Sequence, residues 1–100
     1  MNSVGELLDS AAKDAELPEG LSPELSAMWL TKKDRWDEAH EVAQDIDTPL
    51  GSRIHGLLHV IEGDLGNAGY WYRRAGCPAI QPEEIDQEWE RIVEHILDEK

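Results

Sequence analysis

Histidines are the residues of this chain whose type and spacing could support chemistry. His55 and His59 are four residues apart, so on a helix their side chains stand one above the other, and Glu62 falls on the same side. His40 belongs to the preceding helical segment and can approach them if neighbouring helices pack in order. Imidazoles together with a carboxylate suit zinc or another divalent ion. These four residues are therefore the candidate metal ligands.

The same histidines have other interpretations. Imidazoles between packed helices commonly donate hydrogen bonds to carbonyls or carboxylates and are then purely structural. They can also sense pH or contact a ligand. The segment from His55 to His59 lacks the glutamate that makes the zinc-peptidase helix motif reactive, so we assign no catalytic residue. The fourth histidine, His95, is expected at the surface.

The elements that must position these residues are helices. A capping residue followed by proline occurs at Ser22-Pro23 and at Thr48-Pro49, which is typical of helix starts. Pro78 stops the helix before it. No segment alternates with the period of a strand. The sequence predicts an all-α protein of about six helices, at about residues 4–16, 23–33, 36–46, 49–62, 65–75 and 82–98.

A shift of 29 positions aligns the second and third predicted helices with the fourth and fifth. Ala39 then falls on Ala68, a small residue that lets the second helix of a pair lie close to the first. In the fifth helix, Leu65, Trp71 and Tyr72 are predicted to point inward. We expect two stacked antiparallel hairpins in a repeat-like core at 22–77, with capping helices at 4–16 and 82–98, as a single domain of residues 1–100.

The segment NAGYWYRRAG resembles the closing helix of tetratricopeptide and Sel-like repeats, with Trp71, Tyr72 and Ala75 at the matching positions. The wider pattern over about residues 25–78 also resembles a group of small uncharacterised microbial proteins. Its shared elements are WDEAH from Trp36, the IH and LH pairs of helix four, EGDLGNA, and YWYRRAG. The resemblance implies a helical-repeat fold and no particular activity.

Composition and charge argue against several partners. The chain has 22 acidic and 9 basic residues and a formal net charge of −13, which disfavours nucleic acids and anionic membranes. No apolar run approaches the length of a membrane span, and the first ten residues do not have the pattern of a signal peptide. Cys77 is the single cysteine, so no internal disulfide can form. We expect a cytoplasmic protein.

Two functions follow as hypotheses. The first is a small acidic interaction module or self-associating scaffold without catalytic activity or cofactor, whose partner is another protein or a second copy in a homodimer. The alternative is a protein that binds a divalent metal or small ligand, possibly a hydrolase, through His55, His59, Glu62 and His40. The segment from Tyr70 to Arg74 could also offer a stacking surface, although Trp71 and Tyr72 are expected in the core.

Overall fold

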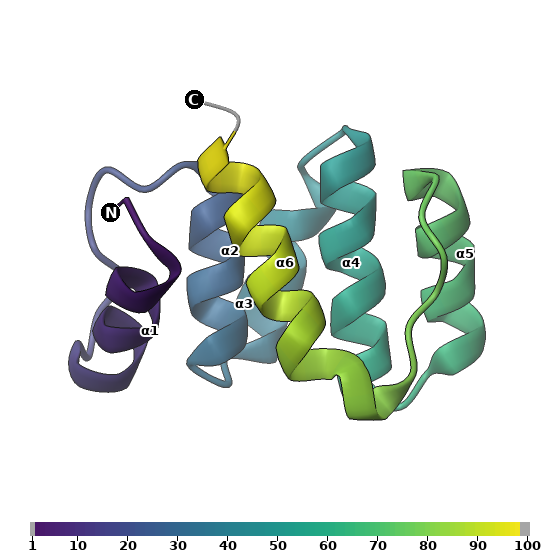
Figure 1. The fold of residues 1–100 in the computed structure, drawn as a ribbon, viewed down its shortest axis with the longest axis horizontal. Helices are drawn as coiled ribbons and strands as arrows, with labels where there is room; N and C mark the ends of the chain where they lie inside the picture. Colours follow the sequence, from purple (N-terminus) through teal and green to yellow (C-terminus); the bar gives the residue numbers. More distant parts are fainter. Residues whose placement is uncertain (1, 99–100) are drawn as a thin grey trace.

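The computed structural model describes residues 2–98, and Figure 1 shows their fold. Across these residues the chain is all-helical, so the predicted fold class is confirmed. The elements are α1 (Val4–Lys13), α2 (Pro23–Lys32), α3 (Trp36–Gln44), α4 (Pro49–Glu62), α5 (Leu65–Ala75), a 3₁₀ turn η1 (Pro82–Glu84) and α6 (Ile85–Asp98).

Local capping explains where the helices begin. The Ser22 side chain accepts a hydrogen bond from the N–H of Leu25, and the Thr48 side chain accepts one from Gly51. In both helices proline occupies the first turn, where no N–H is needed. α1 ends at Lys13, three residues before its expected end, and the last helix opens with the 3₁₀ turn instead of a regular α-helical turn.

The helices form two antiparallel hairpins side by side. α2 packs on α3, α4 packs on α5, and α3 also contacts α4. Figure 1 shows α1 at one end of this row and α5 at the other, while α6 crosses in front of α2 and α4. The N-terminal helix therefore covers an end, whereas the C-terminal helix covers one face of both hairpins.

The two hairpin turns have the same geometry. Asp34 and Gly63, which are 29 residues apart, both take a left-handed conformation, with φ of 65° and 89°. In each turn the next residue donates its N–H to a carbonyl five residues earlier, Arg35 to Leu30 at 3.0 Å and Asp64 to His59 at 2.9 Å. This is the hydrogen bond that commonly ends a helix at a left-handed residue.

The core lies around α4. From residue 51 to residue 60 every residue of α4 is buried except Arg53, which is half-buried. Two buried tryptophans form hydrogen bonds between helices. Trp29 of α2 donates its indole N–H to Ser10 Oγ of α1 at 3.0 Å, and Trp89 of α6 donates to the carbonyl of Met28 of α2 at 2.9 Å. Tyr72 is buried as expected, and Trp71 is half-buried.

The inward position predicted for Leu65 is wrong. Its side chain is 48% exposed. Leu65 opens α5, which lies at the end of the row with α4 on its inner side (Figure 1). The equivalent residue of the first hairpin, Trp36, is half-buried because α4 lies beside it and accepts its indole N–H at the carbonyl of Leu58.

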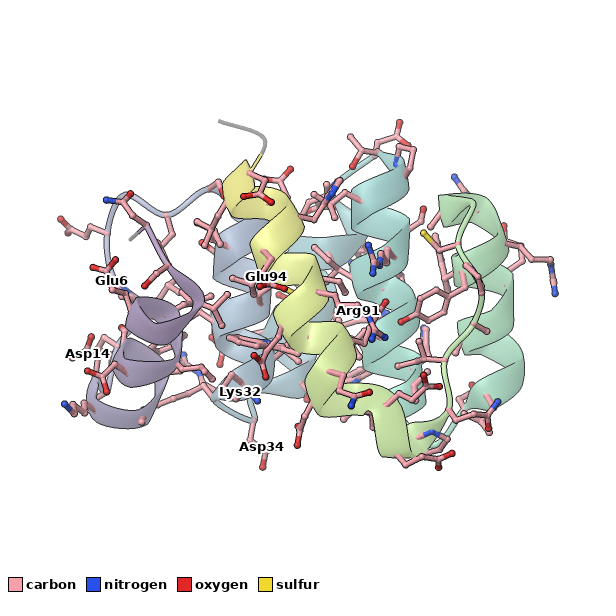
Figure 2. All side chains as sticks on the ribbon, viewed as in Figure 1. Glu6, Asp14, Lys32, Asp34, Arg91 and Glu94 are labelled. Carbon is pink, nitrogen blue, oxygen red and sulfur yellow. The ribbon has the colours of Figure 1, made fainter. Side chains whose placement is uncertain are left out.

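A buried carboxylate joins α6 to the second hairpin. Glu88 is 2% exposed and accepts two hydrogen bonds from Arg53 of α4, at 2.9 and 3.0 Å, and one from the Tyr72 hydroxyl of α5, at 3.0 Å. Arg91 donates to the same carboxylate at 3.1 Å, and Figure 2 shows it between α6 and α4. Burial alone would raise the pKa of Glu88, but these donors, Arg53 first, hold it below its ordinary value.

At the other end of the molecule, Lys33 holds the last turn of α1. Its ammonium group donates to the main-chain carbonyls of Ala11 and Asp14. These carbonyls lie at the C-terminus of the helix and lack partners within it.

None of the helices in residues 2–98 combines the length and the apolar character that crossing a bilayer requires.

Candidate metal centre

Three histidines from two neighbouring helices meet inside the row. His40 comes from α3, and His55 and His59 come from successive turns of α4. Because α4 is the central helix, its histidine side faces neighbouring helices and not water. His55 is 4% exposed and His59 is 6% exposed, while His40 is half-buried.

The side-chain nitrogens of these residues are close together. One ring nitrogen from each of His40, His55 and His59 lies within 4.8 Å of the other two. The ring centroids of His40 and His55 are 4.5 Å apart, and those of His55 and His59 are 4.9 Å apart. Three imidazoles around one tetrahedral zinc ion need nitrogens about 3.3 Å apart. The nitrogens would therefore have to move closer together, by side-chain rotation, to hold an ion.

Glu62, the fourth predicted ligand, lies on the outer side of His59. Its Oε2 is 2.6 Å from Nδ1 of His59. When Nδ1 carries the proton of this hydrogen bond, Nε2 keeps the lone pair that a metal needs. A carboxylate on the second nitrogen is the usual partner of a metal-binding histidine. Glu62 also belongs to a second, more exposed group of possible ligands with His59 and Asp64.

Two tryptophans form the walls of the cluster. Trp71 of α5 stacks on His55 with centroids 3.8 Å apart and planes 10° apart, and Trp36 stacks on His40 at 4.9 Å and 14°. Trp36 is fixed by its hydrogen bond to the carbonyl of Leu58. On Trp71, the guanidinium of Arg74 lies 5.2 Å from the ring centroid. The rings thus limit how far the imidazoles can turn.

Electrostatics keep His55 neutral. Burial first, and then the neighbouring imidazoles of His40 and His59, together lower its pKa to about 4. The neutral imidazole is the form that binds metals. At neutral pH His55 is therefore already in the protonation state that coordination requires.

A glycine allows α5 to approach the cluster. A Cβ atom at Gly56 would lie 2.7 Å from Cδ2 of Tyr72, which is closer than real side chains come. The ring of Tyr72 therefore fits against the α4 backbone only because residue 56 has no side chain. This close approach places the preceding residue, Trp71, over His55.

The sequence identified the three histidines but not their aromatic partners. Trp36 and His40 are four residues apart on one helix, a spacing that could have indicated their contact. No comparable signal existed for Trp71, because its contact depends on how α5 is rotated against α4.

No known family, no curated protein and no solved structure matches this chain.

Proposed function

We propose that this protein binds a divalent transition-metal ion through His40, His55 and His59. The observation that carries the proposal is the grouping of three imidazole nitrogens within 4.8 Å inside the helical row. A purely structural role would predict hydrogen bonds to carbonyls or carboxylates. Within residues 2–98, neither His40 nor His55 has such a bond, and His59 has only its contact with Glu62.

The ligand set favours certain ions. Imidazoles suit Zn²⁺, Cu²⁺ and Ni²⁺, whereas Mg²⁺ and Ca²⁺ prefer oxygen ligands. Three protein ligands leave a fourth position of a tetrahedral ion for water or a small ligand. A hydrolase or a ligand-binding protein would use that position, and His59, oriented by Glu62, would be the best-positioned ligand.

We also infer that the scaffold is related to tetratricopeptide and Sel-like repeats. The support is the pair of hairpins whose turns share a left-handed residue and the same closing hydrogen bond at a spacing of 29 residues. We also propose that the protein is cytoplasmic. The support is its single cysteine, Cys77, because proteins of reducing compartments do not depend on disulfides.

The test is metal binding by protein prepared without an affinity tag. We expect one Zn²⁺ or Co²⁺ per chain in calorimetry, and for Co²⁺ the strong visible absorption of a tetrahedral ion. His55→Ala and His59→Ala should abolish this binding. Glu62→Gln should weaken it by about 10- to 100-fold, because the carboxylate only orients His59.

His95→Ala is the matched control, since it removes an exposed histidine of α6. It should leave the affinity and the stoichiometry unchanged. The proposal fails if the wild-type protein shows no binding at one ion per chain, or if His95→Ala lowers the affinity as much as His59→Ala does.

A further inference from the structure

The outer helix of the row, α5, is the basic part of an acidic protein. Leu65–Ala75 contains Arg73 and Arg74 and no acidic residue, although the chain has 22. Arg53 and Arg91 pair with Glu88, and Arg35 pairs with Glu38. Within residues 2–98, Arg73 and Arg74 are the only arginines without a carboxylate partner.

Apolar and aromatic side chains accompany these charges. Leu65 is 48% exposed and Tyr70 is 46% exposed, and both belong to α5. Figure 1 shows α5 at the end of the row, with α4 on its inner side. Tyrosine and arginine are enriched where proteins meet. We call the exposed residues Leu65, Tyr70, Arg73 and Arg74 the basic end.

The opposite end of the row has the complementary character. It is formed by α1, and the first 20 residues carry five acidic side chains and one lysine. Figure 2 labels Glu6 and Asp14 there. Between α1 and α2 lies a surface hollow of about 490 Å³, lined by Gly5, Leu8, Asp9, Ala11 and Ala12 of α1 and by Lys32 of α2. We call the exposed side of α1, with Glu6 and Asp9, the acidic end.

We propose that a second copy of this chain docks head to tail, with the basic end of one copy on the acidic end of the next. Helical hairpins stack end on end in repeat proteins, so the contact would continue the row that α1 to α5 already form. A symmetric contact between two α5 helices would instead bring Arg73 and Arg74 of both copies together. Repulsion between four guanidinium groups disfavours that arrangement.

A head-to-tail contact that continues the row leaves an open end on each oligomer, so it builds linear oligomers whose length increases with concentration. Because the charges are exposed, the association should weaken as salt screens them. Sedimentation velocity should therefore show oligomers that grow with protein concentration at about 50 mM salt and shrink at about 500 mM salt.

Two charge reversals test which surfaces meet. Arg73→Glu alters the basic end, and Asp9→Lys alters the acidic end. Both side chains are exposed, and the pair that Asp9 forms with Lys13 at 3.2 Å is a surface pair that contributes little, so helix content should stay close to that of the wild type. Each variant should raise the dissociation constant of self-association at least tenfold. Glu41→Lys, an exposed reversal on α3, is the control; it makes the net charge of the chain less negative, so it should not weaken association.

Mixing the two variants gives the deciding result. The acidic end of Arg73→Glu is intact, as is the basic end of Asp9→Lys, so the mixture should regain association that neither variant has alone. A wild-type protein that stays monomeric at every concentration overturns the proposal. A mixture that remains monomeric also overturns it, because the two ends then do not meet. Association that neither reversal weakens overturns it as well, because the contact would then use another surface.

Discussion

His55 combines burial with contacts to three other rings. Trp71 stacks on it at 3.8 Å, and His40 and His59 lie at 4.5 and 4.9 Å. A positive charge at this position would lose its hydration and would face two other groups able to carry the same charge. The folded protein therefore resists protonation of this residue, whereas the unfolded chain does not.

The pH dependence of stability should report this resistance. His55 has a pKa of about 4 in the folded protein and about 6.5 when exposed, so the unfolded state binds the proton more readily between these values. The contribution of His55 to the free energy of unfolding should be fully present above about pH 6.5. It should be lost as the pH drops toward 4, which lowers the free energy of unfolding by at most about 3 kcal/mol. Urea unfolding of the metal-free protein between pH 7 and pH 5 measures this fall.

His55→Gln should flatten the pH profile over this range, because the residue that accepts the proton in the unfolded state has gone. An unchanged slope in His55→Gln would show that other groups produce the pH dependence.

At the scale of elements, the contact between α4 and α5 depends on one missing side chain. Gly56 lets the Tyr72 ring lie against the α4 backbone, and the same approach positions Trp71 over the histidines. α5 buries only Ala68 and Tyr72. The helix is therefore held mainly by this close approach, by the stack on His55 and by the Tyr72 hydroxyl bond to Glu88.

Gly56→Ala should force α5 away from α4. Alanine favours the helix itself by up to about 1 kcal/mol. The clash of its Cβ with the Tyr72 ring should outweigh this gain and destabilise the protein by about 1–3 kcal/mol. Denaturant unfolding measures the loss, and quenching of tryptophan fluorescence by Cu²⁺ should weaken if Trp71 moves away from the cluster.

Gly69→Ala is the matched control within α5. The nearest atom to its new Cβ would be an Arg73 guanidinium nitrogen at 3.9 Å, so nothing needs to move. This variant should be neutral or slightly stabilising. A Gly56→Ala protein as stable as Gly69→Ala would contradict the close-packing argument.

At the scale of the whole molecule, Glu88 links segments that are far apart in sequence. Arg53 lies 35 residues before it and Tyr72 lies 16 residues before it, so one carboxylate joins α4, α5 and α6. A buried ion pair is costly to break because the charge that remains has no partner. The position of α6 across both hairpins therefore depends on this group together with the buried Trp89, Ile92 and Val93.

Glu88→Gln should destabilise the protein by about 3 kcal/mol, since it removes the charge that compensates Arg53 and Arg91. Thermal unfolding followed by circular dichroism measures the change. Glu90→Gln, an exposed neighbour on the same helix, should change stability by no more than about 0.5 kcal/mol. Equal effects of the two substitutions would show that the Glu88 network contributes little.

The sequence predicted most of the helices because their boundaries depend on neighbouring residues. Ser22, Thr48 and Gly76 act within one turn of themselves, and the structure places α5 at Leu65–Ala75 as expected. The histidine pair was visible for the same reason, since its spacing of four is a property of one helix. The role of Glu88 was not visible, because its partners come from other helices and the chain has 21 further acidic residues that look alike.

Lys33 gives the N-terminal helix an attachment that differs from every other helix junction described above. Lys33 is the C-cap residue of α2, yet its ammonium group donates to two carbonyls at the end of α1. Acetylation of this single amine would remove both the charge and two of its donor hydrogens. The first helix would then be held by its buried Leu7 and Ala11 and by the bond from Trp29 to Ser10, so covalent chemistry at one lysine would loosen α1 while leaving the core of α2 to α6 intact.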